Sequence, residues 1–190
     1  MINKTDEQLV ADYLSGDEQA FSLLVSNYLK PIYNFIYRYL NNSSEAEDIA
    51  QDVFVRAWKN IKKFDQKKKF KTWLFAIAKN AALDWFKKKK TIPFTNFESD
   101  DGQNKLLDNL VDPEPLPSEL LEKADLAKEL EQILTQLPAN YRPVLLLYYY
   151  EGFNLREIAE TLNEPLDTIK SRHRRALILI RQLLIPPASG

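Results

Sequence analysis

The stretch NLREIAETLNEPLDTIKSRHRRALILIRQLL, residues 154–184, constrains the fold more than any other part of the chain. Apolar residues recur at helical spacing on both sides of a short turn that contains Asn163 and Pro165. This pattern predicts a helix, a tight turn and a second helix with an apolar stripe along one side. We expect Asp167 to cap the second helix by accepting hydrogen bonds from its first N–H groups.

The side of the second helix away from the apolar stripe is basic. Five basic residues and no acidic residue lie between Lys170 and Arg181. A helix-turn-helix places its second helix in the major groove of DNA, with the N-terminal residues on base edges. The stretch therefore predicts a DNA-binding motif near the C-terminal end of the chain.

The composition of the chain argues against several classes of function. The 190 residues include no cysteine, one histidine and four glycines, so we expect no metal site, no cofactor and no phosphate-binding glycine loop. No residue set offers a nucleophile with a base, and we expect no enzyme activity. The first ten residues lack the apolar run of a signal peptide, and no apolar run reaches membrane-spanning length. The expected location is the cytoplasm.

Charge is strongly segregated along the chain although the net charge is only −1. Residues 61–90 contain eleven lysines and two aspartates, and residues 91–135 contain eleven acidic residues and three lysines. Two basic segments separated by an acidic one are typical of a chain with two nucleic-acid contacts. The alternative, a solvated charged face, is weakened because each basic segment also carries aromatic or helix-turn-helix residues.

Periodicity predicts an all-α fold of two small helical domains joined by a flexible acidic linker. The first domain is expected over residues 1–90, the linker over 91–118 and the second domain over 119–186. The linker contains four prolines, and six acidic residues against one lysine, which does not favour a packed element. In the second domain, a helix over 119–136 is expected to end at Leu137-Pro138.

Several helix starts are predicted from capping residues. Thr5 with Gln8, and Ser44 with Glu47, have the spacing of capping boxes. Asp17 is predicted to cap a helix that reaches Leu40 and bends at Pro31, and Asn140 is predicted to cap a helix with Pro143 in its first turn.

The helix predicted over 44–61 has two different sides. Ile49, Val53, Phe54, Ala57 and Trp58 cover the side that is expected to enter a core. The opposite face carries Asp48, Gln51, Asp52 and Val55. Carboxylates and an amide on one face suit docking to an arginine-bearing partner helix, although a solvated acidic face is the alternative.

The segment FKTWLFAIAKNAALDWFKKKK, residues 70–90, combines aromatic residues with lysines. Leu74, Ile77, Ala78, Ala81 and Trp85 form its predicted core stripe. A neighbouring face carries Trp73, Asn80, Asp84 and Lys87, with Lys71 and Lys79 nearby. Rings stack on unpaired bases and ammonium groups neutralise phosphates, so the segment predicts contact with an opened DNA strand. Core packing is the alternative role for both tryptophans.

Five segments in order resemble the extracytoplasmic-function (ECF) sigma factors of the bacterial primary-sigma family. They are DEQAF, AEDIAQDVFVRAW, FKTWLFAIAKNAALDWFKKK, LPANYRPVLLLYYYEGFNLREIAETL and PLDTIKSRHRRA, and they span nearly the whole chain. The resemblance implies a region 2 domain that docks the β′ clamp helices of RNA polymerase and melts the −10 element. It also implies a region 4 domain that binds the −35 element and the β flap, with the linker directed toward the polymerase active-site cleft.

The resemblance assigns three sets of site residues by position. The polymerase-docking face consists of Asp48, Gln51, Asp52 and Val55. The loop 64–71 resembles the family's pocket for a flipped base. Together with the following helix it gives the −10 set of Phe64, Lys67, Lys68, Lys69, Lys71, Trp73, Lys79, Asn80, Asp84 and Lys87. The −35 set consists of Thr168, Lys170, Ser171, Arg172, Arg174 and Arg175. Core RNA polymerase, promoter DNA and an anti-sigma factor are the expected partners, without membrane insertion.

Two positions depart from the family pattern. Asn163 replaces the usual glycine of the turn, and we expect it to adopt the left-handed conformation. His173 replaces an apolar residue and is expected to be half-buried and structural. Two other functions remain open: a helix-turn-helix regulator of the LuxR type, and an interaction module that holds polymerase without opening DNA.

Overall fold

The computed structural model describes residues 4–89 and 132–184. Within these ranges the chain forms helices and turns, with no β-strand, so the predicted all-α class is confirmed. The predicted linker 91–118 lies outside the described residues. Of the helix predicted over 119–136, only 132–136 are described, and these are helical before the break at Leu137-Pro138.

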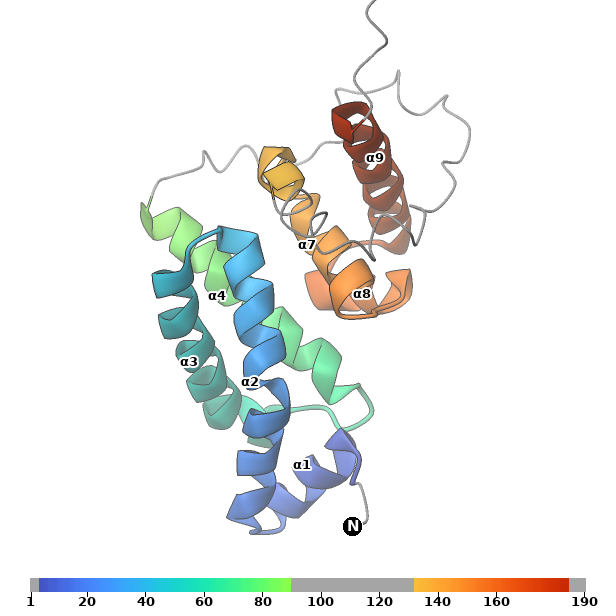
Figure 1. Ribbon diagram of the computed structural model, residues 1–190. Coiled ribbons are helices and arrows are strands. Elements are labelled where there is room, and N and C mark those ends of the chain that lie inside the picture. Colours follow the sequence, from blue (N-terminus) through green and yellow to red (C-terminus); the bar gives the residue numbers. More distant parts are fainter. Residues whose placement is uncertain (1–3, 90–131, 185–190) are drawn as a thin grey trace, which may run out of the picture.

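The N-terminal half contains four α-helices and a short 3-10 helix. They are α1 (Asp6–Leu14), α2 (Glu18–Leu40), α3 (Ser43–Asn60), η1 (Ile61–Lys63) and α4 (Phe70–Lys89). Figure 1 shows α2, α3 and α4 packed together, with α1 beside the first turns of α2. The capping box of Thr5 and Gln8 and the cap by Asp17 are both confirmed, and α2 continues through Pro31.

Aromatic rings fill the centre of this half. Phe35 meets Phe75 edge-on at 5.4 Å between ring centroids, and Tyr39 meets Phe86 at 5.6 Å in the same manner. These four rings are between 0% and 4% exposed. Edge-to-face pairs favour one packing geometry over others, so these contacts hold α2 and α4 at a defined register.

The C-terminal half contains the predicted helix-turn-helix. Its elements are α7 (Arg142–Leu145), the π-helical turn η3 (Leu146–Tyr150), α8 (Leu155–Leu162) and α9 (Leu166–Leu184). Gly152 turns the chain into α8 with a φ of 69°. Asn163 ends α8 in the left-handed conformation with a φ of 55°, as predicted, so an asparagine serves where the family usually has glycine.

Three predicted caps are wrong. The side chain of Asn42, rather than that of Ser44, caps α3 by accepting a hydrogen bond from the Glu45 N–H at 3.2 Å. Asp167 lies inside the first turn of α9, where it favours the helix dipole instead of capping. Asn140 is buried, and the helix that follows begins without a side-chain cap. At α3 the segment 41–45 offers several polar residues in a row, and local sequence does not choose among them.

The two halves pack against each other and share one continuous set of buried side chains. Helix α8 lies against α4, and η3 lies against α2 (Figure 1). Phe153, just before α8, meets Phe75 of α4 edge-on at 5.3 Å. The boundaries 1–90, 91–118 and 119–186 stay a prediction.

Candidate polymerase and nucleic-acid interfaces

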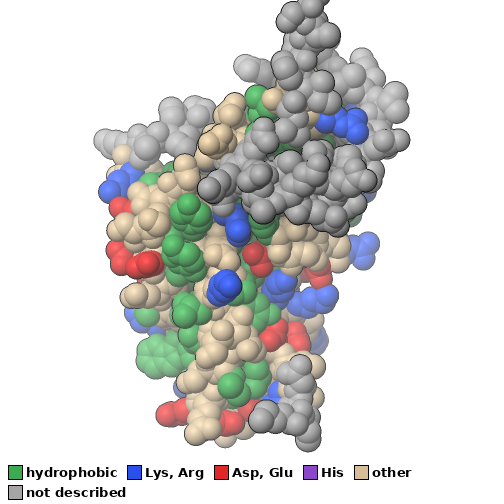
Figure 2. Space-filling model, in the orientation of Figure 1, with side chains coloured by type: hydrophobic (Ala, Val, Ile, Leu, Met, Phe, Trp, Pro, Cys, Tyr) green, Lys and Arg blue, Asp and Glu red, His purple; other side chains and the backbone are tan. Residues whose placement is uncertain are grey.

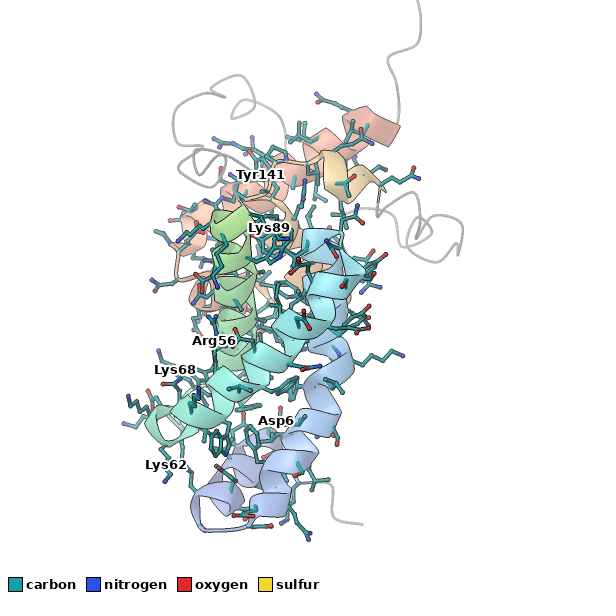
Figure 3. The ribbon with its side chains drawn as sticks, turned by 90° about the vertical axis from the view of Figure 1, so that its left-hand side faces the viewer. Asp6, Arg56, Lys62, Lys68, Lys89 and Tyr141 are labelled. Atoms are coloured by element: carbon teal, nitrogen blue, oxygen red, sulfur yellow. The ribbon has the colours of Figure 1, made fainter. Side chains whose placement is uncertain are left out.

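The predicted docking face on α3 is exposed. Asp48, Gln51, Asp52 and Val55 all lie on the surface, and Val55 is 46% exposed. Arg56 Nε contacts Asp52 Oδ2 at 2.7 Å, and Arg56 Nη1 contacts Asp84 Oδ2 of α4 at 3.0 Å. Figure 3 shows Arg56 on α3 beside α4. No pattern in the sequence pointed to Arg56. Its contact holds the Asp52 carboxylate of the predicted docking face in place.

Trp58 lies on the surface of α3, and its predicted place in the core is wrong. The side chain is 55% exposed, whereas the neighbouring Ala57 is fully buried. Three residues separate Trp58 from Val55, so both lie on one face one turn apart. The spacing was visible in the sequence, but the apolar character of tryptophan suggested burial. Trp58 extends the docking face with a large aromatic group of the kind enriched at protein interfaces.

The loop between η1 and α4 presents two lysines to solvent. Asp65 Oδ1 accepts from the Lys67 N–H at 3.0 Å, and the Asp65 carbonyl accepts from the Lys68 N–H at 2.9 Å. This Asx-type turn keeps both side chains exposed. Lys62 and Lys68 lie near one end of the α3–α4 pair, and Lys89 lies near the other (Figure 3).

Aromatic residues form the base of this loop. The ring of Phe64 lies 5.0 Å from that of Trp73 and 6.0 Å from that of Phe70, measured between centroids. Phe64 is only 7% exposed and Trp73 is half-buried. Phe64 therefore supports the loop through packing and does not face solvent as a DNA-contacting ring would. Trp73 is the aromatic side chain of this cluster that remains partly accessible.

The remaining −10 residues on α4 differ in their surroundings. Asn80 and Lys87 are exposed, and Asp84 is held by Arg56. Lys79 is half-buried, and burial lowers the pKa of its ammonium group, with Arg172 acting in the same direction and Glu164 opposing. Glu164 and Arg172 belong to the C-terminal half, so Lys79 lies at the junction between the two halves.

Helix α9 presents part of the predicted −35 surface. Lys170 is exposed, and Thr168, Ser171, Arg174 and Arg175 are half-buried. Lys170 and Arg174 are four residues apart and share one face. Arg172 is 9% exposed and its guanidinium contacts the Glu164 carboxylate at 2.7 Å. Its assignment to the exposed DNA surface is not supported, because this ion pair fixes the turn instead.

His173 packs against two consecutive tyrosines of η3. Its ring centroid lies 4.6 Å from that of Tyr148 and 5.8 Å from that of Tyr149. The side chain is half-buried, as predicted, and burial lowers the pKa of the imidazole. Burial also raises the pKa of Tyr149 to about 12. These groups are therefore uncharged at neutral pH and stabilise the contact between η3 and α9 by packing.

The lowered pKa of His173 gives stability a defined pH dependence. The unfolded chain binds a proton near pH 6.5, about the ordinary histidine value, but the folded chain binds it only at lower pH. Because the unfolded state then holds more protons, the free energy of unfolding falls as pH drops below about 6.5, by at most about 1.4 kcal/mol per unit of pKa difference. Replacing His173 with phenylalanine keeps a ring between the tyrosines, and melting temperatures should then fall less between about pH 7.5 and 5.5. An equal fall in both proteins would assign the dependence to other groups.

Two family models match this chain. Sigma-70 region 2 matches residues 24–92, and sigma-70 region 4 matches residues 127–180. The chain is 38% identical over 170 residues to the ECF RNA polymerase sigma factor SigW of Bacillus subtilis, covering 89% of this chain and 91% of that protein. It is 29% identical over 187 residues to the RNA polymerase sigma-H factor of Pseudomonas aeruginosa, covering 98% and 97%.

The chain belongs to the ECF sigma factors.

Two solved structures show a similar fold. The structure of CnrH in complex with the cytosolic domain of CnrY has a TM-score of 0.70 at 23% identity, covering 97% of this sigma factor and all of that chain. The sigma factor RpoE of Bartonella quintana, in complex with the anti-sigma factor NepR, has a TM-score of 0.65 at 23% identity, covering 88% and 98%. The region 2 match over α2 to α4 favours a sigma factor over a LuxR-type regulator, because the latter has no use for a strand-melting helix.

Other kinds of site are not found in the described part of this sigma factor. Residues 4–89 and 132–184 hold no group of three or more potential metal ligands. Within the same ranges, no helix is both long and apolar enough to cross a membrane.

Proposed function

We propose that this ECF sigma factor is a dissociable subunit of RNA polymerase that recognises the −10 and −35 promoter elements and starts strand opening. One observation supports this most directly: the α3 face, the lysine loop and the outer face of α9 are separate surfaces of the described helices. Each has the chemistry that its predicted partner requires. Acidic and amide groups suit a basic polymerase helix, lysines suit phosphates, and a basic helix suits the major groove.

The docking surface comprises Asp48, Gln51, Asp52, Val55 and Trp58 on α3. Its partner is proposed to be the β′ clamp helices, while region 4 is proposed to meet the β flap. Charged residues at the rim direct association, and an exposed aromatic residue supplies contact area that excludes water. This division fits an α3 face that is acidic toward its N-terminal end and apolar toward its C-terminal end.

The surface for the melted strand is proposed to centre on Lys67, Lys68, Trp73 and Asn80. Lysines of the loop neutralise the backbone, Trp73 offers a partly accessible ring, and the Asn80 amide reads a base edge. Phe64 takes part by supporting the loop. On α9, Lys170, Ser171 and Arg174, with Thr168 at the helix start, are proposed to read the −35 element.

Other expectations complete the proposal. The protein acts in the cytoplasm with its polymerase, and members of its family are DNA-binding regulators rather than enzymes. An anti-sigma factor is the proposed regulatory partner, and the similar sigma factor RpoE of Bartonella quintana was solved with the anti-sigma factor NepR bound. The linker over 91–118 is proposed to join the two domains inside the polymerase.

Run-off transcription with core polymerase tests the proposal. Promoters are first selected from a random DNA library by the reconstituted holoenzyme. A specific transcript that requires this sigma factor is the expected result. Binding to core polymerase without any transcript would favour an interaction module, and tight promoter binding by the free chain at physiological salt would favour a free-standing regulator.

Arg174 provides a residue-level test of −35 reading. If its guanidinium contacts guanine in a bidentate manner, Arg174→Ala should cost about 1–3 kcal/mol at one position of the −35 element. Preference at that position should relax, while preference at the others is retained. Site selection with the variant holoenzyme measures this directly. Lys87→Ala, a basic-residue change in region 2, is the control because it should leave −35 preference unchanged. Unaltered selection by Arg174→Ala would remove this residue from the reading surface.

A further inference from the structure

One arginine contacts carboxylates that belong to two different proposed surfaces. Arg56 Nε lies 2.7 Å from Asp52 Oδ2 on the docking face of α3, and Arg56 Nη1 lies 3.0 Å from Asp84 Oδ2 on α4. The hydrogen bond to Asp84 is the main cause that raises the pKa of the Arg56 guanidinium, against burial, which lowers it. A permanent positive charge therefore lies between two carboxylates of different function.

Helices α3 and α4 pack against each other, and charged side chains meet across the rim of their contact. The buried sides of both helices carry small residues, which let packed helices approach closely. These are Ala50 and Ala57 on α3 and Ala78, Ala81 and Ala82 on α4. A second ion pair crosses the same contact, between Lys89 and Glu45 at 3.0 Å. Figure 2 shows acidic side chains on the left, over the first turns of α3, with basic side chains beside them near the end of α4.

Asp84 stands beside the residue that is proposed to read a base. Asn80 and Asp84 are four residues apart on α4, so they share one face. Asn80 is exposed, and the Asp84 side chain is 48% exposed. A bare carboxylate on a face that receives a DNA strand is unfavourable, because it repels the phosphates of that strand. The Arg56 guanidinium supplies the counter-charge that offsets this repulsion.

We propose that Arg56 is a positioning residue for the −10 strand, which neutralises the Asp84 carboxylate beside Asn80 and so keeps this face of α4 favourable to phosphates. This inference rests on the proposed function, because it takes the Asn80 face to hold the opened strand. Arg56 acts through Asp84 and does not itself need to touch DNA. The same guanidinium fixes Asp52, so one side chain of α3 serves both the docking face and the strand-binding face.

The chemistry of the guanidinium suits this double contact. Its planar fork of N–H donors can face two carboxylates at once, whereas a lysine ammonium is a single point of charge on a flexible stem. The size of the effect follows from the exposure of the pair. An exposed ion pair changes an equilibrium constant by up to about fivefold, so the contribution of Arg56 to strand binding should be of that order.

Binding of a promoter strand to the holoenzyme tests this role. The probe is the fluorescent non-template strand of a −10 element that the wild-type holoenzyme selects from the random library, and the sigma factor is in excess so that every polymerase carries it. Arg56→Gln should weaken binding of this strand about two- to fivefold, because the Asp84 carboxylate then lacks its counter-charge. An affinity equal to that of wild type would overturn the role of Arg56.

A second substitution, Asp84→Asn in the Arg56→Gln background, separates neutralisation from a structural role. The double variant has no carboxylate to repel phosphates, so its affinity for the strand should return to near wild type. Arg56→Gln combined with Glu18→Gln is the matched control, because it restores the same net charge at an exposed site at the start of α2. This control should stay as weak as Arg56→Gln. If Asp84→Asn restores no more affinity than Glu18→Gln does, Arg56 does not act through Asp84 and the proposal is wrong.

Salt dependence gives a further readout. Repulsion between exposed charges is screened by salt, so the difference in affinity between Arg56→Gln and wild type should narrow as the salt concentration is raised. A difference that stays constant would assign the loss to displacement of α4 and overturn the neutralisation.

Run-off transcription by the wild-type holoenzyme separates this proposal from the proposed function. A normal wild-type transcript without rescue by Asp84→Asn would reject the role of Arg56 alone. Absence of a transcript and of any selectable promoter would refute the proposed function itself.

Discussion

Reversing the charge of Asp52 is expected to weaken binding to core RNA polymerase by on the order of 100-fold, since like charges facing each other across an interface cost several kcal/mol. Asp52 is 48% exposed at its side chain and forms the centre of the acidic end of α3. In Asp52→Arg the new guanidinium faces the basic surface proposed for the clamp helices. It also stands one turn from Arg56, which then keeps only its contact with Asp84 at 3.0 Å.

The fold of Asp52→Arg should be retained. A like-charge pair four residues apart on a helix costs about 0.2–0.5 kcal/mol, far less than the loss in binding. Glu160→Arg is the matched control, because Glu160 is exposed on α8 and lies outside the docking face. Competition with labelled wild-type protein for core polymerase measures the effect. Normal competition by Asp52→Arg at an unchanged melting temperature would show that this face is not the docking site.

Replacing Lys67, Lys68 and Lys69 together with alanine is expected to impair strand opening without changing base preference. Each lost phosphate contact flattens the salt dependence of single-strand binding by about 0.7, so three contacts change the log–log slope by about 2. Opening at physiological salt should fall by on the order of tenfold or more. Base preference should persist because phosphate contacts carry no sequence information.

Permanganate footprinting of the promoter bubble in the holoenzyme measures this prediction. The holoenzyme is the appropriate form because the proposed function assigns strand opening to the sigma factor bound to polymerase. Lys4, Lys30 and Lys62, all exposed and outside the loop, provide a triple-alanine control with the same change in net charge. Asn80→Ala should show the reverse pattern, a normal bubble with altered preference at one −10 position. A normal bubble in the loop variant would exclude the loop from strand holding.

Helical periodicity predicted the all-α class, the helix-turn-helix and the shared face of Asp48, Gln51, Asp52 and Val55. These features are local, because the 3.6-residue repeat alone decides which side chains of one helix point together. Asn163 was predictable for the same reason, since its short polar side chain tolerates the left-handed conformation that the turn requires. The cap at Ser44 failed because neighbouring Asn42 was chemically suitable as well, whereas Asp167 lies inside its helix and Asn140 is buried.

Burial was decided only by the tertiary structure. Trp58 looks like a core residue in the sequence, but no element among the described residues covers its side of α3, and it is left 55% exposed. Phe64 and Arg172 looked like surface residues and are buried, one by the Phe70 and Trp73 rings and the other with the Glu164 carboxylate. Whether a side chain is covered depends on which distant element packs over it, and the repeat of a single helix carries no information about that.

The sequence by itself therefore determined the helices, the side chains that share each face and the family to which the chain belongs. Only the tertiary structure decided which of those faces remain open. Lys69 and Glu157 are 88 residues apart, and their contact exists because Phe153 packs against Phe75 and brings α8 onto α4. Long-range apolar packing sets the relative position of the two halves, and the charged contacts around it follow from that position.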